Sequence, residues 1–217
     1  MQKNGELQYL DCLRTILNDG ESVPNRTGID AITVPHLMIQ HDMSLGFPLL
    51  TTKKMAFKVM KTELEGFIKG VTSKKWFQDR GCRIWDEWCN PTKVKDVPAD
   101  QRKAAQLSED DLGPIYGSQW RAFNGSEAPE ADQFRQIVNR LKTDPTDRRL
   151  VCSAWNPLVL GQQALPPCHV LWHATVIKDR LSLCWWQRSC DFFLGVPFNL
   201  SSYGLLLHLL AKESGLK

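Results

Sequence analysis

Hydrophobic residues recur along this chain with a helical period in some segments and a strand-like pattern in others. Apolar residues return every three or four positions in residues 6–18, 55–68 and 134–141, which predicts three amphipathic helices. A fourth helix is expected from Pro197 through Leu210, because proline suits the first turn of a helix.

Strand-like runs occupy residues 31–43 and 150–155, and a pair of runs follows at 169–177 and 181–189. The short charged turn between the last two runs predicts a hairpin. Pro35 lies inside the first run, which indicates an edge strand or a bulge.

Together these elements predict an α+β fold, with a mixed β-sheet packed with helices. The length and pattern indicate a single domain over residues 1–217. The polar stretch 90–112 is interpreted as a surface insertion, because the apolar pattern resumes on both sides of it.

Composition narrows the class of protein. The chain has 217 residues, of which 42% are hydrophobic, enough for one sizeable core, and its net charge of +3 favours no partner by itself. The 7 cysteines are irregularly spaced without a CxxC pair, which disfavours a disulfide framework. The N-terminus is polar, and no apolar run approaches the roughly 20 residues of a membrane helix. We therefore expect a cytoplasmic protein without a membrane segment.

Cys168 follows two prolines and precedes the predicted hairpin. A thiolate is a strong nucleophile, but a free thiol titrates near pH ~8.5 and needs a nearby cation to ionise at neutral pH. Arg188 supplies that cation if the two late strands pair. Taken alone, a cysteine is more often a buried thiol. That is the interpretation for four others: Cys12, Cys152, Cys184 and Cys190.

Arginines lie at the edges of several predicted elements. A planar guanidinium binds phosphate bidentately, so converging arginines beside Ser189 would form a site for a phosphate monoester. The alternative is solvated surface charge, and spacing alone leaves both open. The arginines in question are Arg26, Arg148, Arg149 and Arg188.

Three further polar residues stand in apolar surroundings. The amide of Asn199 can read the adjacent carbonyl and N–H of a pyrimidine ring, or it can cap a helix. The Asp191 carboxylate needs a partner or a ligand. Glu63 lies on a largely apolar helix, where a raised pKa would suit proton transfer, although a solvent-facing position is equally open.

Other enzyme classes lack their motifs here. A zinc deaminase needs PCxxC, but the residues after Cys168 supply no second thiolate. The chain has neither a P-loop nor a GxGxxG turn. A cysteine protease needs a Cys–His pair, but His169 would point to the opposite face of a strand.

Seven motifs, taken in order, resemble the thymidylate synthase family. The resemblance covers the chain from about Leu7 to its last residue. The motifs are NRTG at 25–28, GFPLLTTKK at 46–54, IWDEW at 84–88, LGPIYGSQWR at 112–121, DRR at 147–149, PPCH at 166–169, and QRSCD with PFN within 187–199.

The resemblance implies reductive methylation of dUMP to dTMP, with 5,10-methylenetetrahydrofolate as co-substrate and no metal. Cys168 would add to C6 of the uracil ring, and the resulting enolate would attack the one-carbon unit. Hydride delivery from the folate would complete the methyl group. Glu63 and Tyr116, with water, would move the protons. The implied catalytic residues are Cys168, Glu63, Tyr116, Arg188 and Asn199.

The resemblance also implies the binding residues and the assembly. It implies a homodimer whose sheets form the interface, with Arg148 and Arg149 reaching the partner's site; no membrane or nucleic-acid partner is expected. The implied substrate-binding residues are Arg26, Arg148, Arg149, Arg188, Ser189, Asp191 and Asn199. The implied folate-binding residues are Trp85, Trp88, Asp191, Gly195 and Phe198.

Two alternatives stay open beside the synthase. A dUMP hydroxymethylase would keep Asn199, whereas the related cytidylate enzymes carry aspartate there; a bulky Trp85 that shields the methylene from water favours methylation. A truncated, inactive paralogue that binds nucleotide or RNA is the other alternative. The chain stops before the family's His-x-Tyr segment and C-terminal tail. This suggests either such a truncated paralogue or an incomplete sequence.

Four positions depart from the family pattern. Glu65 and Gly66 replace an apolar pair on the helix that carries Glu63, which predicts a locally weaker helix. Ala56 stands where many members have histidine, and Trp186 stands where tyrosine is usual.

Overall fold

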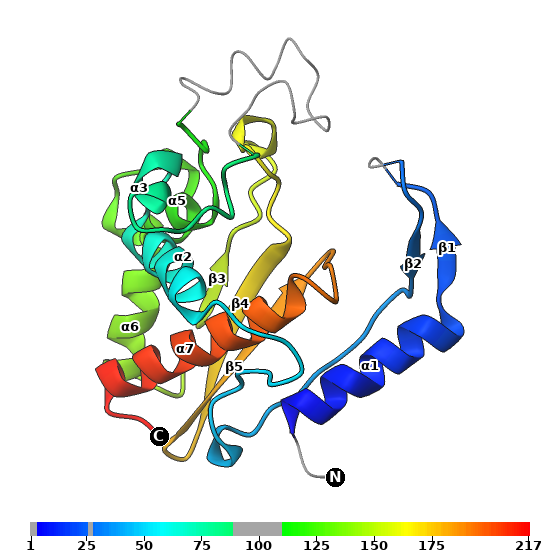
Figure 1. The fold of residues 1–217 in the computed structure, drawn as a ribbon. Helices are drawn as coiled ribbons and strands as arrows, with labels where there is room; N and C mark the ends of the chain where they lie inside the picture. Colours follow the sequence, from blue (N-terminus) through cyan, green and yellow to red (C-terminus); the bar gives the residue numbers. More distant parts are fainter. Residues whose placement is uncertain (1–3, 26–27, 89–109) are drawn as a thin grey trace. The chain divides into compact units, whose positions relative to one another are not determined.

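The computed structural model describes residues 4–25, 28–88 and 110–217, which Figure 1 draws in colour. The insertion expected at 90–112 lies almost wholly outside these residues. Short 3-10 helices occupy Met43–Leu45, Phe123–Gly125, Pro129–Ala131 and Leu160–Gln162. The other elements are α1 (Gly5–Asp19), β1 (Glu21–Val23), β2 (Ala31–Thr33), α2 (Phe57–Lys69), α3 (Lys74–Gln78), α5 (Tyr116–Arg121), α6 (Gln133–Thr143), β3 (Val151–Ser153), β4 (His169–Ile177), β5 (Arg180–Gln187) and α7 (Val196–Ser214).

This mixture of helices and antiparallel strands confirms the predicted α+β class. The four predicted helices are confirmed as α1, α2, α6 and α7, with ends shifted by a few residues. Within the described residues, no helix combines the length and apolar character needed to cross a bilayer.

The chain divides into two compact units. The first comprises the residues up to Met55 together with Asp191–Gly204, and the second comprises Ala56–Cys190 with Leu205–Lys217. Helix α7 begins in the first unit and ends in the second. The single domain expected from the sequence is not tested by this division and stays a prediction.

The first unit is built around α1. Asn4 caps this helix by accepting hydrogen bonds from backbone N–H groups of its first turn. The Glu6 carboxylate accepts a hydrogen bond from the backbone N–H of Thr51 at 2.6 Å. The ring of Tyr9 stacks on that of Phe192, with centroids 5.5 Å apart. These contacts join segments of the unit that are far apart in the sequence.

The strand predicted over residues 31–43 is wrong beyond Thr33. Strand β2 ends there, after pairing antiparallel with β1 so that Ile32 lies opposite Ser22. Pro35 has no backbone N–H to donate, so a hydrogen-bonded ladder does not continue through it. The spacing of apolar residues alone therefore overestimates the length of this strand.

The second unit contains an antiparallel sheet with strand order β3-β4-β5. Strands β4 and β5 form the predicted hairpin, and His169 lies opposite Gln187 at the end away from the turn. Strand β3 pairs with the other edge of β4, where Cys152 lies opposite Trp172. The strand predicted at 150–155 is therefore confirmed with shorter bounds.

Alternate residues of the sheet point to opposite faces. Trp172 is buried on the inner face, where its ring meets those of Trp120 in α5 and Phe134 in α6, with centroids 5.8 and 6.2 Å away. Figure 1 shows α5 and α6 beside β3. The opposite surface, here called the outer face, is formed by residues that include Val151, His173, Thr175, Ile177, Arg180, Ser182, Cys184 and Trp186.

The cysteines follow this alternation. Cys12 and Cys152 are buried, as predicted, and Cys82 is buried as well. The prediction is wrong for Cys184 and Cys190, which are exposed. Cys184 lies on the outer face, and Cys190 lies in the loop after β5, so neither position is covered.

Gly66 lets α2 approach α3 closely. A Cβ at this position would lie 2.3 Å from Cε1 of Phe77, a ring that is fully buried. The glycine that weakens helix propensity at this site therefore makes room for an aromatic core residue.

We expect Gly66→Ala to lower the free energy of unfolding by about 1–2 kcal/mol. Overpacking costs about 1–3 kcal/mol, whereas the gain in helix propensity is at most about 1 kcal/mol. Urea unfolding checks this, with Glu65→Ala as the control, since its half-exposed position should change stability by less than about 0.5 kcal/mol. Equal or higher stability of Gly66→Ala would show that Phe77 moves freely aside.

Candidate active site

Cys168 lies immediately before β4, at the end of the hairpin away from the turn, and is half-buried. The backbone N–H of Arg188, the first residue after β5, donates a hydrogen bond to the carbonyl oxygen of Cys168 at 3.0 Å. The late strands therefore pair as the sequence predicts, and this pairing brings the thiol-bearing residue and the arginine together.

The guanidinium of Arg188 holds the loop that carries the cysteine. Its Nε donates to the carbonyl oxygen of Pro167 at 3.0 Å, and its Nη2 donates to that of Pro166 at 2.9 Å. The guanidinium carbon also lies 5.7 Å from the ring centroid of Trp155. The sequence analysis did not single out this tryptophan. It lies after the short strand β3, and only the three-dimensional contact marks it.

Tyr116 connects α5 to the cysteine loop. It is buried at the first residue of α5, and its hydroxyl oxygen accepts a hydrogen bond from the backbone N–H of Cys168 at 2.8 Å. Burial, reinforced by the nearby Cys168, raises the pKa of this phenol. The hydroxyl therefore keeps its proton at neutral pH and can donate it to a bound molecule.

Glu63 has the raised pKa that its apolar helix suggested. Its side chain is half-buried on α2, and one carboxylate oxygen accepts a hydrogen bond from the indole N–H of Trp85 at 3.0 Å. Burial raises the pKa of Glu63 to about 7, and the hydrogen bond from Trp85 partly opposes this. A carboxyl with this pKa exchanges protons readily in both directions at neutral pH.

Aromatic rings connect these groups. Phe67 lies 4.8 Å from Tyr116 and 6.2 Å from Trp85 between ring centroids, and Trp85 lies 6.1 Å from Tyr116. The His169 ring lies 5.4 Å from that of Tyr116. Trp85 and Tyr116 are both almost fully buried, so their polar atoms are held by packing.

Within the second unit, the structure thus brings together five of the residues predicted from sequence. They offer a nucleophile, a neighbouring cation, a hydroxyl that stays protonated and a carboxyl that titrates near neutrality. They are Cys168, Arg188, Tyr116, Glu63 and Trp85. Two further predicted residues of this unit, Ser189 and Trp88, are exposed and half-buried respectively.

The remaining predicted residues from the QRSCD and PFN blocks belong to the first unit. Asn199 is the fourth residue of α7, so it is not the terminal cap of that helix. Oδ1 of Asp191 accepts hydrogen bonds from the backbone N–H groups of Phe193 and Leu194, at 3.0 and 2.7 Å. This carboxylate is exposed, unlike the apolar setting that the sequence suggested.

The other first-unit residues implied by the resemblance also lie around the start of α7. Gly195 precedes the helix, and a Cβ there would lie 3.0 Å from the carbonyl oxygen of Asp191. Phe198 is half-buried in the first turn.

The predicted phosphate-binding arginines differ in their surroundings. Arg148 and Arg149 are exposed and lie just before β3. Arg149 is paired with Asp147, with 2.9 Å between Nε and Oδ1. Arg26 lies outside the described residues. Among residues 4–25, 28–88 and 110–217, no three metal-ligating side chains group together.

Comparison with known proteins identifies the family. The family model of thymidylate synthase matches residues 7–217. A thymidylate synthase of Mycoplasma genitalium (strain ATCC 33530 / DSM 19775 / NCTC 10195 / G37) is 42% identical over 224 aligned residues, which cover 97% of this chain and 76% of the relative. These findings support the synthase and neither alternative, the hydroxymethylase or the inactive paralogue. The activity is accordingly that of a methyltransferase of nucleotide biosynthesis, and the chain belongs to the thymidylate synthase family.

Proposed function

We propose that the substrates are dUMP and 5,10-methylenetetrahydrofolate, and that Cys168 is the nucleophile that attacks the pyrimidine. The observation that carries the proposal is the position of Cys168, whose backbone N–H donates to the Tyr116 hydroxyl and whose carbonyl accepts from Arg188. The backbone of Cys168 is thus held from both sides, by the Tyr116 hydroxyl and by the backbone N–H of Arg188, and a half-buried thiol on a fixed backbone suits covalent addition to an electron-poor ring.

The covalent step forms a bond between Sγ of Cys168 and C6 of uracil, and the ring electrons move through C5 towards O4. C5 then attacks the methylene carbon of the folate. Loss of the C5 proton to water expels tetrahydrofolate from this carbon and leaves an exocyclic methylene at C5. Hydride from the tetrahydrofolate adds to that methylene as the Cys168 thiolate leaves C6, which gives the methyl group, the restored ring and dihydrofolate. The thiolate leaves unchanged, as a catalyst must.

Glu63 and Tyr116 handle the protons in this proposal. With a pKa of about 7, Glu63 is present in both protonation states at neutral pH and can stabilise charge at O4 or relay a proton through water. The raised pKa of Tyr116 keeps its hydroxyl protonated, so Tyr116 donates a hydrogen bond that orders the water molecule taking up the C5 proton. The carboxyl and the phenol have separate roles because burial shifts their pKa values to different ranges.

The phosphate of dUMP is assigned to Arg188 and Ser189, with Arg26 completing the set. Arg188 uses Nε and Nη2 on the two prolyl carbonyls, and a guanidinium has further N–H groups to offer to an anion. Asn199 is assigned to reading O4 and N3 of the uracil. Its position inside α7 supports this, because a helix holds an amide more rigidly than a loop does.

The folate is assigned to Asp191, Gly195 and Phe198 around the start of α7, and to the tryptophans Trp85 and Trp88. The chemistry of Asp191 fits a pterin, which presents N–H donors. Its Oδ1 is occupied by backbone N–H groups, whereas Oδ2 accepts no hydrogen bond from the residues that the structure describes. A half-buried Phe198 offers an aromatic surface for stacking.

A homodimer is proposed on the outer face of the sheet. This face carries polar residues such as Arg180 and Ser182, but it also exposes Ile177 at 67% and Trp186 at 58%, and exposed apolar side chains of this size favour an interface. Arg148 and Arg149 lie next to β3, the edge strand of the same sheet, from which they would reach the partner's phosphate site. Sedimentation measurements of the purified protein would give its mass in solution.

Incubation of the purified protein with dUMP and methylenetetrahydrofolate tests the proposed substrates. We expect dTMP, identified by mass, together with an equal amount of dihydrofolate, followed by its absorbance. Deoxyuridine, which lacks the phosphate, should be a far poorer substrate. Hydroxymethyl-dUMP formed without dihydrofolate would contradict the proposal.

A further inference from the structure

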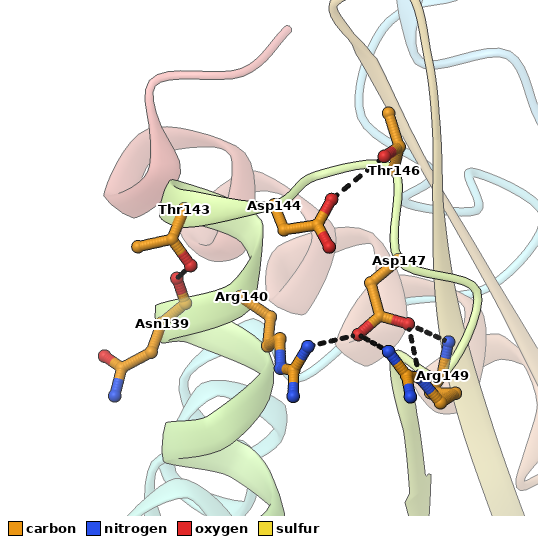
Figure 2. Close-up of polar contacts among 7 residues, drawn as sticks. All are labelled: Asn139, Arg140, Thr143, Asp144, Thr146, Asp147 and Arg149. Atoms are coloured by element: carbon orange, nitrogen blue, oxygen red, sulfur yellow. Dashed lines mark hydrogen bonds and ion pairs between the residues drawn. The ribbon is translucent and has the colours of Figure 1, made fainter.

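The loop before β3 contains an ion cluster around Asp147, a residue to which the proposed reaction assigns no role. Figure 2 shows Asp147 between two arginines, Arg140 of α6 and Arg149. Oδ2 of Asp147 accepts from Nη1 of Arg140 at 2.7 Å. Oδ1 accepts from both the backbone N–H and the Nε of Arg149, each at 2.9 Å, and Oδ2 accepts from its Nη2 at 3.3 Å. We call these three residues the Asp147 cluster.

The Asp147 carboxylate is enclosed although its partners are not. Its side chain is 3% exposed, whereas those of Arg140 and Arg149 are 46% and 80% exposed. Hydrogen bonds from Arg149 hold the pKa of Asp147 below its usual range. Asp147 is therefore a permanently ionised group with all its contacts directed at the two arginines, and it has no surface from which to touch a substrate.

Arg149 owes its orientation to this pair. An arginine that is 80% exposed gains little order from packing, and a free arginine side chain retains about 2 kcal/mol of rotamer entropy. The side-on pair with Asp147 uses Nε and Nη2, and the other N–H groups find no acceptor among the described residues. The free edge of the guanidinium is thus held ready for an anion.

The charge balance keeps this edge attractive to anions. A carboxylate beside a single arginine would cancel its charge, but the Asp147 cluster contains two guanidinium groups and one carboxylate. The cluster as a whole stays positive. Arg148 provides the contrast, since it is exposed and forms no ion pair with the described residues.

We propose that Asp147, itself held by Arg140, is a positioning residue that orders Arg149 for the phosphate of dUMP. This rests on the assignment of Arg149 to the phosphate under the proposed function. Because the guanidinium is already ordered before binding, less side-chain conformational entropy is lost when the phosphate binds.

Asp147→Asn is expected to raise KM for dUMP about 3–10-fold with kcat within about twofold, since immobilising one long side chain has that scale. KM for the folate should not change. The matched control is Asp144→Asn, which removes a carboxylate from the same loop. Asp144 accepts from Oγ1 of Thr146 and acts on Arg149 through its charge, without a hydrogen bond to it among the described contacts. It should therefore change KM for dUMP less than Asp147→Asn does and leave KM for the folate unchanged.

A double-mutant cycle separates positioning from a general structural role. If Asp147 acts through Arg149, then Asp147→Asn should not raise KM for dUMP further in an Arg149→Ala background. An additive effect of the two substitutions would overturn the inference, as would an unchanged KM in Asp147→Asn. Arg140→Met, which leaves the pair with Arg149 intact, should show a smaller increase and supplies a variant in case Asp147→Asn folds poorly.

The same cycle distinguishes the two proposals. If Arg149→Ala raises KM for dUMP but Asp147→Asn does not, the phosphate assignment stands and the positioning role falls. If Arg149→Ala leaves KM unchanged, both fall, while turnover of dUMP by the wild-type protein still supports the proposed substrates.

Discussion

Cys168→Ala is expected to lower the rate of dTMP formation by roughly four to six orders of magnitude, the scale of losing an enzyme nucleophile. Without Sγ no bond to C6 can form, so C5 never becomes nucleophilic. The Kd for dUMP should change by no more than about tenfold, because the substitution leaves in place the arginines, the serine and the amide assigned to dUMP. Turnover by mass and binding by calorimetry would together establish this separation.

The matched control for this substitution is Cys12→Ala, which removes a buried thiol from α1. It should keep its turnover, apart from a modest loss of stability. If Cys168→Ala retained more than about 1% of wild-type turnover, another group would have to start the reaction and the proposed mechanism would be wrong.

The hairpin and the residues at its open end could be predicted from the sequence because they depend on local pairing. Two apolar runs around a short charged turn predict the hairpin of β4 and β5, which brings Cys168 near the residues that follow β5. A register shift between His169 and Leu171, which the pattern did not predict, then pairs Cys168 with Arg188. For Glu63 the sequence left a raised pKa and a solvent-facing position equally open, and burial of the carboxylate in the folded protein decides for the raised pKa.

Contacts between distant segments were not predictable from pattern. The hydrogen bond between Tyr116 and Cys168 joins the first residue of α5 to the loop before β4, and their meeting depends on the packing of α5 against the sheet. Family resemblance named Tyr116, but no periodicity did. The Asp147 cluster was not predicted for a similar reason. In the sequence, Asp147 is one more carboxylate in a polar loop, and only the folded structure brings Arg140 of α6 to it.

The solvent exposure of side chains on the sheet was also not predictable from the sequence. Cys184 was expected to be buried because cysteines usually are, but burial follows the face of a strand and not the residue type. The outer face carries exposed Ile177 and Trp186 as well, beside the polar Arg180 and Ser182. A partner subunit on that face would cover these two apolar side chains.

Glu63→Gln is expected to lower kcat by about 100–1,000-fold and to remove the inflection near pH 7 from its pH profile, as for loss of a general acid–base group. Glutamine keeps the hydrogen bond from Trp85 but exchanges no proton. A profile of kcat from pH 5.5 to 8.5, roughly centred on the pKa of about 7, would detect the missing inflection.

The same substitution makes a prediction about stability that is independent of catalysis. The folded-state pKa of Glu63, about 7, lies above its ordinary value of 4.5, so folding favours the protonated form. That contribution is fully present below pH 4.5 and is lost as the pH rises through about 7. Wild-type stability should therefore fall relative to Glu63→Gln over this interval, as measured by urea unfolding at each pH.

Glu65→Gln is the control for both measurements, because Glu65 lies on the same helix but is paired with Lys69 at the surface. The hydrogen bond from Lys69 lowers the pKa of Glu65, so its removal should leave the inflection near pH 7 in place. If the inflection persisted in Glu63→Gln, another group would set it. If the inflection vanished while the stability curves stayed parallel, Glu63 would titrate only in the complex with substrate, and the burial seen in the free protein would not be its cause.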